Sequence, residues 1–173
     1  SAPDIKGFVD HAHDLSLLVH VDGSRVANAI AAHGMSPSDA VGDADIVTVG
    51  GTKNGMLFGD ALLVRRPERF TGIHFVQKQI GHLASKQRYI AAQFLALLDA
   101  DLWLQTAAHA NAMARRLGDG LTSLGLRLAS PVEANEVFVT LDPAAHRRLS
   151  QAYAVHRPDL TVPVWRLVCS WAT

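Results

Sequence analysis

Residues 17–25 read LLVHVDGSR, and residues 44–55 read ADIVTVGGTKNG. Each stretch is a compact apolar run that ends in a polar turn, which is typical of a parallel strand with helices on both faces. Residues 24–33 predict a helix between them, with Ser24 near its cap and Gly34 at its exit. A strand, a helix and a second strand in this order indicate an α/β fold.

Apolar runs and turns continue on both sides of this unit. A short helix is expected over residues 5–16, and the run after Gly55 is expected to form a strand that returns. The C-terminal part predicts a smaller α+β portion behind a long helical connection. Its expected helices cover residues 76–98, 101–125 and 143–152, and its expected strands cover residues 126–128, 136–141 and 165–171.

The composition is that of a globular protein with balanced charge. The chain has 173 residues, with 16 basic and 16 acidic side chains, so it gives no reason to expect a nucleic-acid or membrane partner. Its single cysteine, Cys169, excludes an intrachain disulfide and favours a cytoplasmic location. The longest apolar runs, such as residues 90–100, are shorter than the roughly 20 residues of a membrane span.

The first candidate site residue is Asp22, directly after an expected strand. In open α/β sheets, ligands bind beyond the carboxyl ends of the strands. Asp22 and Gly23 also suit an ordinary turn, and Ser24 suits a helix cap. Both interpretations stay open on this stretch alone.

The second candidate is Lys53, which lies among glycines at the end of the next expected strand. Glycines let the backbone turn sharply and let a bulky ligand approach. Burial at this edge would favour a neutral, nucleophilic amine. The alternative is a solvated lysine in a glycine-rich turn. A phosphate-binding P-loop is excluded, because Lys53 is followed by Asn54 and lacks the longer glycine-rich loop.

Together the two residues indicate a specific cofactor. Pyridoxal 5'-phosphate (PLP) requires a lysine that forms a Schiff base and a carboxylate that pairs with the pyridine nitrogen. Asp22 and Lys53 are 31 residues apart (53 − 22), which leaves room for one helical crossover between neighbouring parallel strands. The pair therefore predicts a PLP site.

Four blocks of sequence resemble consecutive blocks of the low-specificity threonine aldolase family, of PLP fold type I: HVDGSRVANA, DIVTVGGTKNGM, QKQIGHLASKQRYIAAQF and WRLVCSWAT. The resemblance implies a lyase that cleaves a β-hydroxy-α-amino acid, such as threonine or allo-threonine, to glycine and an aldehyde. It also implies a homo-oligomer, a dimer or tetramer. Residues 1–72 would then be the C-terminal part of a PLP-binding large domain, residues 73–98 a connecting helix, and residues 99–173 a small α+β domain.

The resemblance also assigns roles by position. Lys53 would form the Schiff base, and Asp22 would keep the pyridine nitrogen protonated. Arg25 would contact the ring on the side of its 3-oxygen. Arg166 would bind the substrate carboxylate, and Lys86, or Lys78 in its place, would reach the cofactor phosphate of a neighbouring subunit.

Each role has a structural alternative. Arg25 suits an exposed helix position, and Lys78 and Lys86 suit solvated helix faces. Arg166 lies in an apolar strand, where a charge needs an anionic partner, internal or bound. No histidine pair has convincing metal-ligand spacing, so we expect no metal site.

Members of the family that the chain resembles are about twice as long, and the resemblance starts after their N-terminal part. That part supplies a histidine that stacks on the ring and a phosphate-binding loop. The chain is then either a piece of a normal enzyme or a half-length protein that needs a partner chain. Two other functions stay open: another fold type I lyase that carries out β-elimination, and an inactive subunit that binds a partner.

Overall fold

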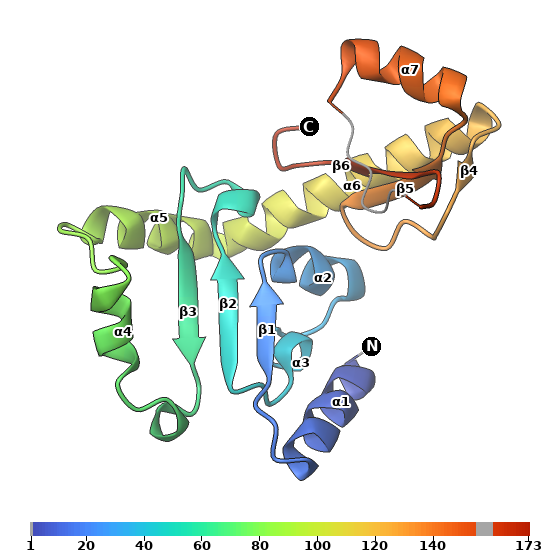
Figure 1. The fold of residues 1–173 in the computed structure, drawn as a ribbon. Helices are drawn as coiled ribbons and strands as arrows, with labels where there is room; N and C mark the ends of the chain where they lie inside the picture. The colour runs from blue at the N-terminus through green and yellow to red at the C-terminus, as the bar shows by residue number, and fades with distance from the viewer. Residues whose placement is uncertain (1, 155–160) are drawn as a thin grey trace. The chain divides into compact units, whose positions relative to one another are not determined.

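The computed structural model describes residues 2–154 and 161–173. The chain divides into two compact units, residues 1–105 and 106–173. Each unit contains its own three-stranded sheet, labelled in Figure 1 as β1 to β3 and β4 to β6. The α/β class expected from the sequence is therefore confirmed, and each unit is described separately.

The sheet of the first unit has the strand order β1-β2-β3. Strand β1 (His20–Gly23) runs parallel to β2 (Ile46–Gly50), and β3 (Asp60–Val64) returns antiparallel to β2. Helices α2 (Val26–His33) and α3 (Pro37–Val41) form the crossover between the parallel strands. The expected strand–helix–strand unit and the returning strand are both confirmed, and Gly34 ends α2 in the left-handed conformation.

The core of this unit lies on one face of the sheet. Helix α1 (Ala2–Asp14) contributes Val9 and Ala12, which pack against Val47 of β2. On β1 itself, His20 and Asp22 are exposed. The expectation that β1 is buried on both faces is therefore wrong, because the described helices cover only one of them.

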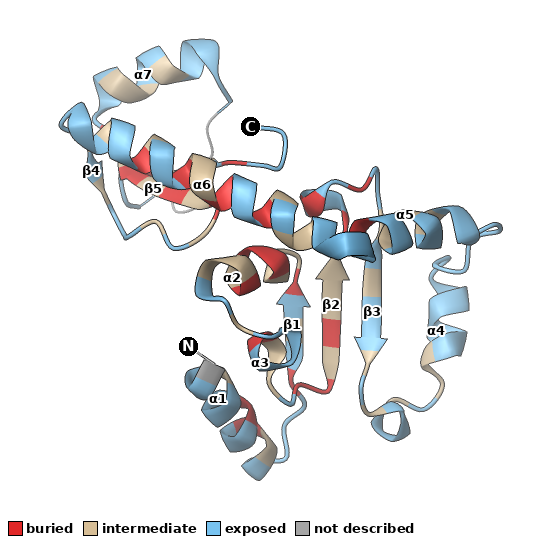
Figure 2. Ribbon diagram, turned by 180° about the vertical axis from the view of Figure 1, so that it is seen from behind, coloured by how far each residue is buried: buried red, intermediate tan, exposed pale blue. Residues whose placement is uncertain are grey.

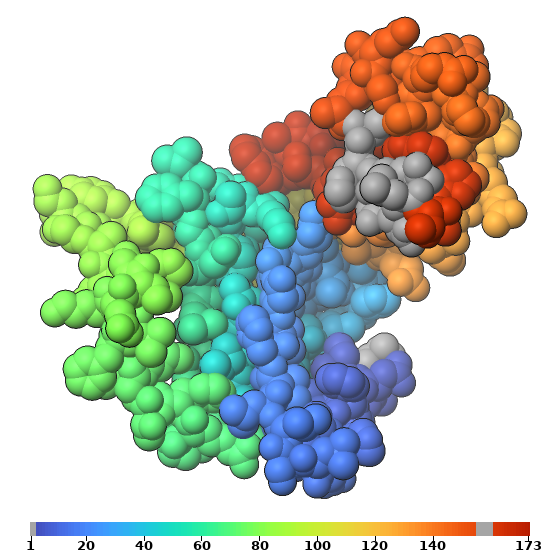
Figure 3. Space-filling view, viewed as in Figure 1, coloured from blue at the N-terminus to red at the C-terminus, as the bar shows by residue number. Residues whose placement is uncertain are grey.

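Two views show this asymmetry. No described helix lies in front of β1, β2 and β3 in Figure 1, and the side chains of β1 are at the surface in the space-filling view (Figure 3). Seen from behind, buried residues of this unit lie on α1, α2, β2 and the loop that leads into β2 (Figure 2).

The single helix expected over residues 76–98 is also wrong. The structure has α4 (Ile73–Gln79) and α5 (Arg88–Leu98), separated by a turn. Gly81 and Lys86 have positive φ values of 79° and 62°, which an α-helix does not allow. Short 3₁₀ turns flank this region at Pro67–Arg69 and Asp99–Asp101, and another, Thr52–Asn54, lies between β2 and β3.

The second unit packs a helix against an antiparallel sheet. Helix α6 (Leu102–Ser123) begins within the first unit and ends before Gly125, whose φ is 79°. Strands β4 (Arg127–Leu128), β5 (Glu136–Thr140) and β6 (Val164–Val168) follow, with α7 (Pro143–Ala152) after β5. Asp142 caps α7 through its carboxylate. The expected helix over residues 143–152 is confirmed.

Candidate cofactor and substrate site

The carboxylate of Asp22 is held by the turn that follows it. The backbone N–H of Ser24 and its hydroxyl both donate to Oδ1 of Asp22, at 3.0 Å and 2.5 Å. This is the Asx-type turn that aspartate often forms with the residue two positions later. Ser24 does not cap α2 as expected, because Arg25 occupies the N-cap position and no side chain caps the helix there.

Lys53 lies in the 3₁₀ turn directly after β2, and side chains on both sides of it fix this turn. Asn54 is buried and donates from Nδ2 to the carbonyl oxygen of Trp103 at 2.8 Å. The backbone N–H of Gly59 donates to the hydroxyl of Thr52 at 3.1 Å. The position of the Lys53 backbone is therefore set by its neighbours in the sequence.

The structure brings the Asp22 and Lys53 turns together. A Cβ atom on Gly50 would lie 2.8 Å from Cα of Ser24 and 2.9 Å from its carbonyl oxygen, so only glycine permits this approach. In the sheet, Asp22 pairs with Thr48 of β2, a few residues before Lys53. The two candidate residues thus belong to adjacent turns at the carboxyl edge of parallel strands.

Asp22 is kept ionised by its surroundings. The hydrogen bonds from the Ser24 hydroxyl and backbone N–H lower the pKa of Asp22 and outweigh a small opposing effect of desolvation. The positive charge of Lys53 lowers this pKa further. Asp22 is therefore a permanent anion at neutral pH, as the partner of a protonated pyridine nitrogen must be.

The side chain of Lys53 is exposed in the described chain. The sequence predicted a buried lysine at this edge, and that prediction is wrong for this chain. The reason is the uncovered face of the sheet, on which no described element lies over the turn. Arg25 is half-buried at the start of α2, next to the Asp22 turn.

Arg166 lies in the middle of β6, in the second unit, and has the internal anionic partner that the sequence required. Its Nη1 is 3.5 Å from Oε1 of Glu136 on β5. Trp165 is buried in the core, whereas Arg166 is one third exposed, as expected for neighbours on opposite faces of a strand. The Nε atom of Arg166 is buried and has no hydrogen-bond partner among the described residues.

The remaining predicted residues lie elsewhere. Lys86 is exposed in the turn before α5, so the helix-face alternative is wrong for it, while Lys78 lies in the last turn of α4. Among residues 2–154 and 161–173 no group of three or more His, Cys, Asp or Glu side chains is arranged to hold a metal ion. Within the same ranges, no helix has the length and apolar character to cross a membrane.

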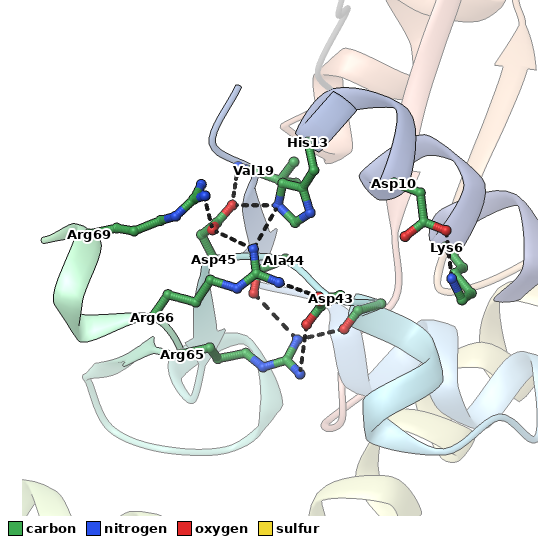
Figure 4. Close-up of polar contacts among 11 residues, drawn as sticks. Lys6, Asp10, His13, Val19, Asp43, Ala44, Asp45, Arg65, Arg66 and Arg69 are labelled. Carbon is green, nitrogen blue, oxygen red and sulfur yellow. Dashed lines mark hydrogen bonds and ion pairs between the residues drawn. The ribbon is translucent and has the colours of Figure 1, made fainter. Parts of the chain in front are cut away.

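Sequence reasoning missed a cluster at the opposite end of the strands (Figure 4). Asp45 is fully buried and accepts from the backbone N–H of Val19 at 2.8 Å. It also lies 2.9 Å from Nε2 of His13 and 3.3 Å from Nη1 of Arg66. Arg66 also pairs with Asp43. This cluster joins α1 to the start of both parallel strands and the end of β3.

The same contacts determine the ionisation of Asp45. Burial raises the pKa of this carboxyl group, but the hydrogen bonds from Val19 and His13 lower it. The charges of His13 and Arg66 lower it further, and the net pKa lies below the ordinary value. The cluster is structural, and no sequence motif marks it, since its members are up to 53 residues apart.

The donor set around Asp22 and Lys53 fits PLP. An ionised carboxylate and a primary amine lie on neighbouring turns, and Gly50 leaves no side chain between them. A carboxylate and a lysine beyond the carboxyl edge of parallel strands are groups that a PLP-binding α/β protein requires.

The chain belongs to the beta-eliminating lyase family. The sequence model of that family, described as "Beta-eliminating lyase", matches residues 1–144. The expectation of a β-eliminating lyase or threonine aldolase relationship is therefore confirmed.

Two individual proteins are similar to the chain over most of its length. The chain is 36% identical over 174 residues to the low specificity L-threonine aldolase of Pseudomonas aeruginosa, covering 98% of this chain and 50% of the relative. It is 26% identical over 146 residues to the alanine racemase TOXG of Cochliobolus carbonum, covering 80% of this chain and 37% of the relative. The chain thus spans about half the length of the aldolase that it matches.

A solved structure agrees on the fold. The threonine aldolase of Leishmania major superposes with a TM-score of 0.88 at 27% sequence identity. The match covers 99% of this chain and 52% of the other. The fold type I class expected from the sequence is therefore confirmed for this chain.

Proposed function

We propose that the chain is part of a PLP-dependent lyase that cleaves β-hydroxy-α-amino acids, such as threonine, to glycine and an aldehyde. The observation that carries the proposal is the approach of two turns, one with an ionised carboxylate and one with a lysine amine. The similarity to threonine aldolases supports the choice of reaction. The complete reaction also requires groups other than this carboxylate and this amine.

In this proposal each residue has one task. Lys53 would hold PLP covalently through its amine, and Asp22 would keep a proton on the pyridine nitrogen. Arg25 and Lys86 would contact the 3-oxygen side and the phosphate. When bound, PLP supplies an electron sink for the pair of electrons released from the Cα–Cβ bond.

Arg166 would bind the carboxylate of the substrate. A guanidinium presents a planar fork of donors that matches a carboxylate in two parallel hydrogen bonds. Glu136 approaches Nη1 of Arg166 at 3.5 Å, beyond a short hydrogen bond, and the buried Nε has no partner among the described residues. Glu136 therefore orients the guanidinium, and the one-third exposed side chain can offer its remaining donors to a second anion.

The test is an assay of glycine release from L-threonine and L-allo-threonine by the chain supplied with PLP. We expect Arg166→Lys to raise KM at least tenfold, because a lysine cannot form the bidentate contact. Arg127→Lys, on exposed β4 of the same sheet, is the control and should leave KM unchanged. PLP bound at Lys53, with 2-oxobutanoate and no glycine released from threonine, would contradict the aldolase proposal.

A second candidate reaction is β-elimination or another transformation of an amino acid with the same cofactor. Over 80% of its length the chain is also similar to a protein named for a different reaction, an alanine racemase. This similarity supports a second candidate reaction. The products decide between them. Threonine yields glycine and acetaldehyde in the aldol cleavage, but 2-oxobutanoate and ammonia in the elimination.

Assembly and location are proposed with the function. Residues 1–72 would be the C-terminal part of a large domain, residues 73–98 the connection, and residues 99–173 the small domain. We propose a homo-oligomer, a dimer or tetramer, in the cytoplasm. The buried, unpaired thiol of Cys169 supports that location.

A further inference from the structure

Ser24 makes two hydrogen bonds with the carboxylate of Asp22. Its N–H and its hydroxyl both donate to the same carboxylate oxygen, Oδ1. The hydroxyl is not used to cap α2, which begins after Arg25 without a side-chain cap. Its hydrogen bond to Asp22 is therefore not part of a helix cap.

The contact leaves the second oxygen of Asp22 accessible. Among residues 2–154 and 161–173, none donates a hydrogen bond to Oδ2. The neighbours on the same sheet face are occupied with each other, because Nε2 of His20 lies 2.9 Å from Oγ1 of Thr48. The turn thus fixes one oxygen and leaves the other for a donor that approaches from the exposed face.

The turn formed by Asp22 and Ser24 is also held by Gly50, which precedes the turn that contains Lys53. Gly50 packs so closely on the backbone of Ser24 that a Cβ atom would not fit between them. A shift of Ser24 would therefore change the distance between Asp22 and the turn that begins after Gly50. Lys53 lies on that turn.

We propose that Ser24 is a positioning residue for the cofactor: it fixes Oδ1 of Asp22, so that Oδ2 would accept a hydrogen bond from the protonated pyridine nitrogen of bound PLP. This inference rests on the proposed function for PLP itself, and it adds a residue that touches neither substrate nor cofactor. The hydroxyl also helps to hold the pKa of Asp22 low, together with the charge of Lys53.

The first test compares the chain with Ser24→Ala and Ser24→Thr before cofactor is added. Carbon NMR of labelled aspartate measures the pKa of Asp22 in each. We expect the alanine variant to raise this pKa and threonine, which keeps the hydroxyl, to restore it. Asp142, the cap of α7, is the internal control and should titrate identically in all three proteins.

The second test measures the Kd for PLP by absorbance titration of the same three proteins. Loss of one hydrogen bond to the ionised partner should weaken binding about threefold to tenfold in Ser24→Ala. Ser24→Thr should bind like the parent chain. Circular dichroism confirms that the variants are folded.

The outcomes separate the two proposals. If the parent chain binds PLP but Ser24→Ala changes neither the pKa of Asp22 nor the Kd, the role of Ser24 is overturned and the proposed function stands. If the parent chain binds no PLP, the proposed function fails and the role of Ser24 falls with it. A raised pKa and a weaker Kd, both restored by threonine, support the inference.

Discussion

At the scale of single residues, the molecule depends on polar groups at both ends of the parallel strands. At one end, Asp22 accepts two hydrogen bonds and is exposed; at the other, Asp45 accepts from the backbone and from His13 and is fully buried. The exposed carboxylate of Asp22 is accessible to a ligand, whereas the buried hydrogen bonds of Asp45 stabilise the fold.

Asp45→Asn should destabilise the chain by about 2 to 3 kcal/mol, because charge-assisted hydrogen bonds are lost in a buried place. Chemical denaturation at neutral pH measures the change. Asp43→Asn is the matched control: Asp43 also pairs with Arg66 but is exposed, so its loss should cost less than about 1 kcal/mol. Equal effects of the two variants would contradict the role given to burial.

The stabilisation from Asp45 depends on pH in a defined direction. Its pKa is lower in the folded chain than in the unfolded chain, so the folded state favours the ionised form. The contribution is complete above the unfolded pKa of about 3.9 and is lost as the pH falls through the lower folded value. The difference between the parent chain and Asp45→Asn should therefore shrink in denaturation curves measured below about pH 4. A difference independent of pH would contradict this assignment.

At the scale of elements, helix α6 offers a test of packing with two glycines. A Cβ atom on Gly120 meets nothing within 4 Å, whereas one on Gly118 would lie 2.8 Å from Cγ2 of Val132. Gly120→Ala should stabilise the chain by about 0.5 to 1 kcal/mol through helix propensity. Gly118→Ala should destabilise it, since a β-branched side chain cannot move aside easily. Thermal unfolding measures both, and a gain from Gly118→Ala would refute the packing.

Much of the element order was predictable from the sequence, because apolar runs and their terminating glycines reflect local energetics. The strand around Val47, the exit of α2 at Gly34 and the helix after Asp142 all follow such rules. The continuous helix expected over residues 76–98 was wrong, because the backbone at Gly81 and Lys86 has positive φ values that interrupt it.

The candidate site was predictable in part for a similar reason. Asp22 lies at the C-terminal end of β1 and Lys53 lies in the turn after β2, and the spacing of the two residues in the sequence indicates proximity. The contact of Ser24 with Asp22 was open to prediction from the Asp-Gly-Ser sequence, which favours an Asx turn as much as a helix cap. The exposure of Lys53 was not predictable, because it depends on what covers the other face of the sheet.

At the scale of the whole molecule, the first unit leaves apolar side chains exposed on its sheet. Leu62 of β3 is 53% exposed and lies on the face that carries Asp22 and Thr48. If the proposed homo-oligomer uses this face, Leu62→Lys should weaken it, because a charge there cannot be buried without a partner. Leu124→Lys, 80% exposed in the second unit, is the control. Sedimentation measures both, and an unchanged oligomer in Leu62→Lys would exclude this face.

The proposed function requires Lys53 to hold PLP covalently. The most direct measurement is borohydride reduction of the chain with PLP, followed by mass spectrometry of its peptides. We predict one labelled peptide, which contains Lys53, and no stable label in Lys53→Ala. Lys6→Ala, at an exposed position on α1, should label like the parent chain. Label on another lysine, or an unchanged label in Lys53→Ala, would contradict the cofactor site.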